Sequence, residues 1–185
     1  MKNWITFFSQ TGSEIGLVAT AINRWPDLVI TNNPQPFANR PENELCKALK
    51  EGKTKLYTIP SRPTLEDYKN ALMFFDAKDT LITLHGYLRI IPGEICDNYQ
   101  ILNGHPGRIW VDESLKGFNA QEKAWKRGDE IGGSVIHECV AKLDSGRILA
   151  KKECSIKGLT LDETYATLHD NSVSLWIEYL KPILG

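Results

Sequence analysis

The segment LNGHPG holds two side chains suited to carbonyl chemistry, Asn103 and His105. Alternation along an extended segment would direct both side chains to the same side. A histidine exchanges protons near neutral pH, and an asparagine amide can donate a hydrogen bond to the negative charge that develops on an attacked carbonyl. Taken alone, such a pair is more often a turn asparagine beside a histidine whose hydrogen bonds are satisfied within the fold.

The segment LDSG contributes a carboxylate, Asp144, in a turn expected between two strands. A carboxylate near His105 would orient the imidazole and favour its charged form. His137, on the strand before the turn, is a supporting partner. An aspartate before Ser-Gly is also an ordinary hairpin sequence, so the turn alone does not require chemistry. The other two histidines, His85 and His169, have no comparable neighbours in the sequence and are expected to be structural.

A third candidate is the small-residue loop SQTGS, which precedes a helical stripe. Free amide groups and the positive dipole end of a helix attract anions, so Gly12 and Ser13 form a candidate phosphate-binding turn. A plain turn with a helix cap explains the same two residues and is favoured when they are taken alone. Glu14 argues against a bound phosphate because two neighbouring anions repel each other.

The elements that would position these residues alternate between short apolar strands and amphipathic helices. Strands are expected at residues 4–9, 27–31, 56–59, 80–84, 99–102, 133–140 and 147–156, and helices at 13–25, 42–51, 64–75, 119–127 and 161–180. Such alternation predicts an α/β fold with a mostly parallel sheet and helices on both faces. Ligands bind such sheets beyond the carboxyl ends of the strands, which favours the loops 9–14, 85–92 and 103–116 as binding segments.

The composition excludes several other classes of protein. A chain of 185 residues fits a single domain, residues 1–185, and its net charge of −1 gives no bulk attraction to nucleic acid or anionic membrane. The four cysteines are scattered and form no CxxC pair, which predicts reduced thiols and neither a zinc site nor a disulfide framework. The sequence shows no signal-peptide pattern and no membrane-span-length apolar run, so a cytoplasmic protein is expected.

Taken in order, these segments resemble the folate-dependent formyltransferase family, which includes phosphoribosylglycinamide formyltransferase and the catalytic domain of methionyl-tRNA formyltransferase. The stretch LHGYLRIIPGEICDNYQILNGHP resembles the family's apolar, arginine-bearing loop and its Asn-x-His-Pro motif. The stretch KGFNAQEKAWKRGDEIGGSVIHECVAKLDSGRIL resembles its helix, strand and Leu-Asp-x-Gly turn, and SQTGSEIGLVATAI resembles the phosphate loop of the phosphoribosylglycinamide enzymes. The likeness covers nearly the whole chain and implies a Rossmann-like, formyltransferase-like fold.

The resemblance also implies roles for individual residues. Asn103, His105 and Asp144 match the family's catalytic trio. Part of the folate pocket would be formed by Leu88, Arg89, Ile90 and Ile91, and the turn from Val140 to Asp144, including Leu143, would line the pteridine site. The implied formyl donor is 10-formyltetrahydrofolate, without a metal ion.

Two departures from the family pattern bear on the acceptor. The loop HPGRIWVDESLKG carries a short insertion before Gly117, so we expect it to be re-formed. Glu14 replaces the family's asparagine in the phosphate loop, which disfavours glycinamide ribonucleotide as the acceptor. Arg108 in the altered loop would offer anion binding, although a solvated loop arginine is equally consistent with the sequence.

The sequence therefore predicts transfer of a formyl group to an amine of a small acceptor, such as an amino sugar or a nucleotide. Asn103 and protonated His105 would stabilise the oxyanion, and Asp144 would hold His105 and assist proton movement through water. Two alternatives remain open: hydrolysis of formyltetrahydrofolate, and a non-catalytic folate- or nucleotide-binding module. The expected partners are folate and the small acceptor, and not a large nucleic acid or a membrane.

Overall fold

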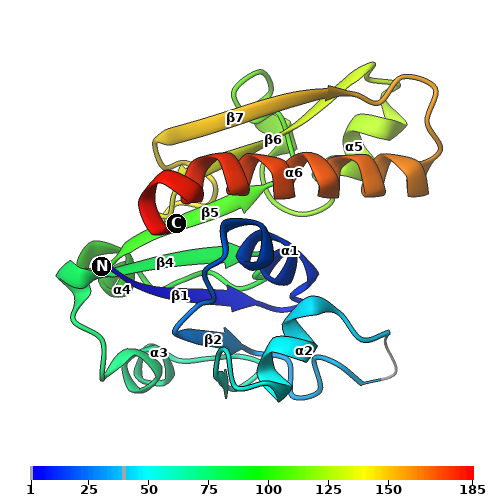
Figure 1. Ribbon diagram of the computed structural model, residues 1–185. Coiled ribbons are helices and arrows are strands. Elements are labelled where there is room, and N and C mark those ends of the chain that lie inside the picture. Colours follow the sequence, from blue (N-terminus) through cyan, green and yellow to red (C-terminus); the bar gives the residue numbers. More distant parts are fainter. Residues whose placement is uncertain (1, 39–40) are drawn as a thin grey trace.

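A seven-stranded sheet forms the centre of the computed structural model, which describes residues 2–38 and 41–185 (Figure 1). The order is β3-β2-β1-β4-β5-β6-β7, with bounds β1 Asn3–Phe8, β2 Leu28–Thr31, β3 Leu56–Thr58, β4 Thr80–His85, β5 Gln100–His105, β6 Ile131–Glu138 and β7 Ile148–Ser155. Strands β1 to β5 pair in parallel, whereas β6 is antiparallel to both β5 and β7. The strand order reverses between β1 and β4, and sheets of this kind bind ligands at such a reversal.

Helices cover both faces of the sheet (Figure 1). Helix α1 lies beside α6 on one face, and α2 packs against α1, while α3 and α4 cover the other face. The bounds are α1 Ser13–Ile22, α2 Glu44–Lys50, α3 Leu65–Leu72, α4 Gly93–Asn98, α5 Ala120–Lys126 and α6 Leu161–Leu184. None of the helices in the described ranges is both long and apolar enough to cross a bilayer.

The predicted α/β fold, with a mostly parallel sheet between two helical layers, is confirmed. Several boundaries differ from the prediction. Helix α1 ends at Ile22 and not at residue 25, because Asn23 adopts a left-handed conformation with φ 56°. Strand β5 continues to His105, so both reactive side chains of LNGHPG lie within it. Helix α4 was not predicted because its six residues are too few to show a helical repeat.

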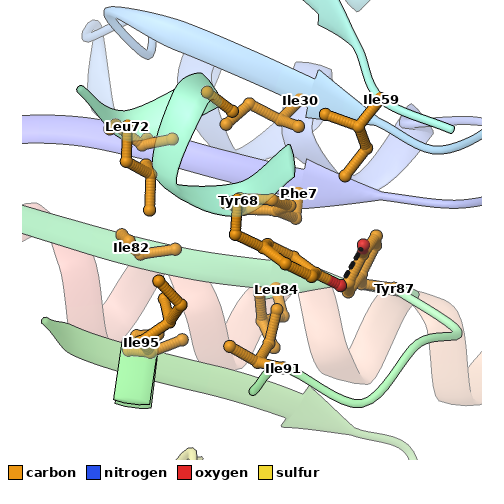
Figure 2. Close-up of a cluster of buried hydrophobic side chains, with 13 residues drawn as sticks. Phe7, Ile30, Ile59, Tyr68, Leu72, Ile82, Leu84, Tyr87, Ile91 and Ile95 are labelled. Carbon is orange, nitrogen blue, oxygen red and sulfur yellow. Dashed lines mark hydrogen bonds between the residues drawn. The ribbon is translucent and has the colours of Figure 1, made fainter. Parts of the chain in front are cut away.

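The sheet face under α3 and α4 is filled by a large apolar cluster (Figure 2). Phe7 of β1 packs against Tyr68 of α3 and against Tyr87, which follows β4. The hydroxyl groups of Tyr68 and Tyr87 share a hydrogen bond of 2.8 Å inside this cluster. Ile91 also points into it and is only 3% exposed. These contacts fix the loop after β4, which was one of the predicted binding loops.

The opposite face buries Trp4 of β1 and Trp176 of α6 together. Gly104 of β5 lies directly against Trp176. A Cβ atom at Gly104 would be 2.5 Å from Nε1 of Trp176, closer than side chains can approach. The glycine between Asn103 and His105 is therefore required because α6 presses a fully buried indole against this strand.

Candidate active site

Adjacent strands place three polar side chains at one edge of the sheet. Asn103 and His105 lie on β5, separated by Gly104, and Asn103 pairs in register with His137 on β6. Because side chains alternate along a strand, Asn103 and His105 share one side. Sequence reasoning predicted this pair, and the antiparallel pairing of β6 explains how His137 reaches them.

Asp144 approaches these side chains from the turn between β6 and β7. Its backbone is left-handed, with φ 45°, a conformation that aspartate tolerates better than most residues. Its Oδ2 accepts a hydrogen bond of 2.8 Å from the backbone amide of Gly117 and lies 3.4 Å from Nδ1 of His105. Its Oδ1 accepts a bond of 3.3 Å from Nδ2 of Asn103 and lies 3.4 Å from Nε2 of His137. The structure therefore brings the amide, the imidazole and the carboxylate together.

The surroundings of Asp144 keep its carboxyl group ionised. Burial alone would raise its pKa. The contact with His137, the nearby His105 and the amide of Gly117 outweigh burial and hold the pKa at about 2. The site thus contains a fixed negative charge at neutral pH, against which both imidazole rings are positioned.

His105 is 6% exposed, and both of its ring nitrogens face protein groups. Its Nε2 lies 2.7 Å from the carbonyl oxygen of Leu115 and must carry a proton, because a carbonyl oxygen only accepts. Burial lowers the pKa of His105 by more than Asp144 and the Leu115 carbonyl raise it, so the pKa lies below its ordinary value of 6.5. The sequence predicted that Asp144 would favour the charged ring. The carboxylate has that effect, yet burial is larger and the ring is mainly neutral at pH 7.

The amide of Asn103 is oriented by its two acceptors. Its Nδ2 donates to Nε2 of His137 at 3.1 Å and to Asp144 at 3.3 Å. The reverse orientation would set an amide oxygen against the carboxylate, which is unfavourable. Nδ1 of His137 donates to the carbonyl of Glu138 at 2.8 Å, which leaves Nε2 free to accept. Both amide bonds are long, so one can be exchanged for a stronger acceptor.

A short stretch of backbone contacts two of the three side chains. The carbonyl of Leu115 contacts His105, and the amide of Gly117 contacts Asp144. Both residues belong to the segment around the insertion that distinguishes this chain from the family pattern. Backbone groups leave no mark in a sequence, so sequence reasoning missed these contacts. A cavity of about 840 Å³ lies elsewhere, between α2 and β3, and none of the three side chains lines it.

The residues predicted for the folate pocket are only partly available to a ligand. Ile90, Val140 and Leu143 have exposed side chains, Leu88 is half-buried, and Arg89 donates hydrogen bonds to the carbonyls of Ser61 and Leu88. The side chain of Ile91 is buried in the core, so at this position only the backbone can face a ligand.

One apolar residue beside this site was not predicted. Phe118 is 63% exposed and follows Gly117, whose added Cβ would lie 3.6 Å from Leu143. An exposed phenylalanine directly after a glycine was the signal available in the sequence. These apolar side chains beside the trio match a flat aromatic ligand.

The loop that opens α1 has the geometry of a helix cap. Gly12 is left-handed with φ 65°, and a Cβ there would lie 2.5 Å from Leu45 of α2. The turn therefore requires glycine for structural reasons alone. The hydroxyl of Ser13 lies 2.9 Å from that of Thr11 and 3.3 Å from Nε2 of His169 on α6. Only the packing of α6 beside α1 brings this histidine to the loop, so the sequence gave no sign of it.

Glu14 turns inward and pairs with His85, at 2.7 Å between Oε2 and Nδ1. The side chain of His85 is fully buried and also contacts Thr83 at 2.9 Å. Burial has the largest single effect and would raise the pKa of Glu14, but the hydrogen bond and charge of His85, together with Ser172 and His169, lower the net pKa. The prediction that His85 has no comparable neighbour was wrong, because β1 and β4 are adjacent in the sheet although far apart in the chain.

Arg108 lies on the far side of β6 from these groups. Its guanidinium binds Glu153 of β7 at 2.7 and 2.9 Å, so a carboxylate already balances its charge. The structure gives Arg108 no contact with Gly12, Ser13 or Glu14, the other residues predicted to bind the acceptor. Within residues 2–38 and 41–185, no three His, Cys, Asp or Glu side chains gather as a metal site would require.

The sequence matches a known protein family over most of its length. A family model described as formyl transferase matches residues 3–180. The chain belongs to the formyl transferase family. Among curated relatives, the dTDP-4-amino-4,6-dideoxyglucose formyltransferase of Mycobacterium tuberculosis (strain ATCC 25618 / H37Rv) is 26% identical over 133 residues, 68% of this chain and 52% of the relative. The chain therefore spans about half the length of the curated relatives it matches.

Solved structures share the fold of this formyl transferase family member. Phosphoribosylglycinamide formyltransferase from Anaplasma phagocytophilum matches with a TM-score of 0.79 and 23% identity, covering 98% of this chain and 86% of the other. The enzyme of the same name from Streptococcus pneumoniae TIGR4 matches with a TM-score of 0.78 and 22% identity, covering 99% of both chains. A formyltetrahydrofolate deformylase from Pseudomonas syringae pv. tomato str. DC3000 matches with a TM-score of 0.77 and 17% identity, covering 98% of this chain and 61% of the other. Identities this low establish the fold only.

Proposed function

We propose that this protein transfers a formyl group from 10-formyltetrahydrofolate to an amine of a small acceptor. The observation that carries the proposal is the convergence of Asn103, His105 and Asp144 within 3.4 Å contacts at one edge of the sheet. Ile90, Val140, Leu143 and Phe118 expose apolar side chains on the segments next to the site, and such side chains suit a flat pterin ring. The donor would supply an activated formyl carbonyl, and the protein residues would position and protonate the groups around it.

Each of the three side chains would have a separate task. Nδ2 of Asn103 would exchange one of its long hydrogen bonds for the formyl oxygen as negative charge develops there. Nδ1 of His105, unprotonated in the free protein and next to Asp144, would accept through water the proton that the attacking amine releases. Asp144 would stabilise the resulting imidazolium from 3.4 Å. His105 would then return that proton to the leaving nitrogen.

The acceptor is proposed to approach from the loop that opens α1. The carboxyl ends of β1, β4 and β5 lie at one edge of the sheet, so this loop is about 10 Å, two strand spacings, from Asn103. Ser13 and His169 present a hydroxyl and an imidazole there. The ionised Glu14 within the same loop disfavours a phosphate beside it and favours a hydroxyl-rich or amine-bearing group. An amino sugar, the acceptor class named for the mycobacterial relative, fits this chemistry.

Hydrolysis of the formyl group is a second candidate. A neutral His105 beside Asp144 could remove a proton from water as readily as from an amine. One structural relative is a formyltetrahydrofolate deformylase, which supports this alternative at the level of the fold. The two candidates differ in one product, because hydrolysis releases formate without any acceptor.

The test is incubation with 10-formyltetrahydrofolate and a panel of amino sugars, amino nucleotides and glycinamide ribonucleotide. Transfer predicts that one acceptor gains the mass of a formyl group, whereas hydrolysis predicts formate in every sample. Asn103→Ala and His105→Ala should each lose roughly 100- to 1000-fold in turnover, the usual effect of losing one such contact.

Asn98→Ala is the matched control for these two variants. Asn98 is an exposed asparagine on α4 that bonds only to its own helix, so its loss should leave turnover unchanged. Near-normal turnover in Asn103→Ala or His105→Ala would contradict the role of that residue. Folate binding without any formyl loss would instead indicate a non-catalytic module.

A further inference from the structure

Two cysteine thiols lie next to each other behind the proposed folate pocket. Cys96 is on α4, and Cys139 follows β6 directly. Their Sγ atoms are 3.8 Å apart, although 43 residues separate them in the chain. Neither thiol has a role in the proposed formyl transfer. The sequence predicted four scattered, reduced thiols, and the fold brings two of them into contact.

The positions of both thiols are fixed by their surroundings. The backbone amide of Cys139 bonds to the carbonyl of Ile101 on β5 at 2.8 Å, which continues the sheet to this residue. Cys96 lies on the inward side of α4, with Sγ 3.8 Å from the carbonyl of Ile91. Both side chains pack against the apolar cluster of Figure 2, yet both keep partial exposure to solvent. A small reagent from solution can therefore reach a pair that stays in place.

The two thiols differ in acidity. The hydrogen bond with Cys139 lowers the pKa of Cys96 despite partial burial. The same contact, together with burial, raises the pKa of Cys139. The thiolate is the form that reacts with oxidants, and this difference favours Cys96 as the attacking sulfur.

We propose that Cys96 and Cys139 form a peroxide-sensitive modification site, in which hydrogen peroxide converts the two thiols into a disulfide. The Cys96 thiolate attacks one peroxide oxygen, breaks the O–O bond, forms a sulfenic acid and releases hydroxide. The Cys139 thiol then attacks the sulfenic sulfur, forms the S–S bond and releases water. The two sulfurs lose two electrons in total, and the peroxide gains them.

The disulfide joins the two segments assigned to the folate pocket, and this consequence rests on the proposed function. Cys96 follows the segment 88–91, and Cys139 precedes the turn 140–144 that carries Asp144. The start of α4 lies close to the turn, since a Cβ atom added to Gly93 would be 3.5 Å from the Cβ of Ala141. Bond formation shortens the sulfur separation from 3.8 Å to about 2.05 Å and draws the segments together. The narrowed pocket is expected to bind folate at least several-fold more weakly.

The test treats the reduced full-length chain with a small excess of hydrogen peroxide under native conditions. The peroxide is then removed, free thiols are alkylated, and intact and peptide masses are measured. The expected product has lost two hydrogens and links the Cys96 peptide to the Cys139 peptide. Cys96→Ser and Cys139→Ser should lose this product, while Cys154→Ser, the matched control, should retain it.

Affinity for 5-formyltetrahydrofolate, an air-stable folate, is measured by calorimetry before oxidation, after oxidation and after reduction with dithiothreitol. Weaker binding that dithiothreitol restores, absent in Cys96→Ser, would support the proposal. Oxygen added to either sulfur without a cross-link, or no reaction, would overturn it. A cross-link with unchanged affinity would refute the effect on the pocket. Failure of the reduced protein to bind folate would contradict the proposed function and the effect on the pocket. The intact and peptide masses would still show whether the two thiols form a disulfide.

Discussion

Replacing Asp144 by asparagine separates the charge of this residue from its shape. Asparagine has nearly the same volume and also tolerates the left-handed backbone, φ 45°, found here. Its side-chain oxygen can still accept from the amide of Gly117. What the variant loses is the negative charge that faces His105 and His137. Asp144→Asn therefore imitates the protonated aspartate.

The size of the effect follows from the pKa of Asp144. The folded protein holds it at about 2, compared with an ordinary value of 3.8. Since one pKa unit corresponds to about 1.36 kcal/mol, full pairing stabilises the ionised fold by about 2 kcal/mol. We therefore expect Asp144→Asn to lose about 1–2 kcal/mol in free energy of unfolding near pH 6.

The pH dependence tests the cause of this loss. A carboxyl whose pKa is lowered by folding stabilises the fold above its unfolded pKa, and this contribution disappears as the pH falls through the folded value. The difference between the wild type and Asp144→Asn in urea denaturation should thus persist down to about pH 4 and close toward about pH 2. Asp97→Asn, at an exposed carboxyl on α4, is the control for loss of one charge. A difference below about 0.5 kcal/mol near pH 6, or one that stays constant down to low pH, would show that the charge of Asp144 does not stabilise the fold.

Three further predictions follow from the same contacts. Titration of the His105 ring by NMR should give a pKa below 6.5, and a still lower one in Asp144→Asn because the carboxylate raises it; a value above 6.5 would contradict the dominance of burial. Gly104→Ala should destabilise the fold by about 1–3 kcal/mol in urea denaturation, because the new methyl group meets the buried Trp176; unchanged stability would show that α6 can move away. Glu14→Gln should lower the thermal midpoint at pH 7, since it removes a buried charge bonded to histidine, and an unchanged midpoint would show that the ion pair adds no net stability.

Much of the fold was predictable because its signals are local. The strands around the site are short apolar runs, and the sequence of β1 already shows both faces of the sheet. Trp4 packs under α1 and α6, whereas Phe7 packs under α3 and α4. The three side chains that meet in the fold could be singled out for a related reason. Asn103 and His105 are neighbours in sequence, and Asp144 stands in a recognisable turn.

The contacts that were missed depend on packing between distant segments. His85 meets Glu14 only because β4 lies next to β1, and His169 meets Ser13 only because α6 packs beside α1. No local pattern records either pairing. The neutral state of His105 was also beyond sequence reasoning, because it results from a balance between burial and a neighbouring charge.

The antiparallel hairpin of β6 and β7 means that the two parts of the proposed active site come from different parts of the sheet. The last parallel strand, β5, ends at His105, and Asp144 lies 39 residues later in the turn between β6 and β7. Lengthening or shortening that turn would shift Asp144 while the parallel strands stay unchanged. The same scaffold could therefore change the group it attacks, or lose reactivity altogether, through alterations confined to one hairpin bend.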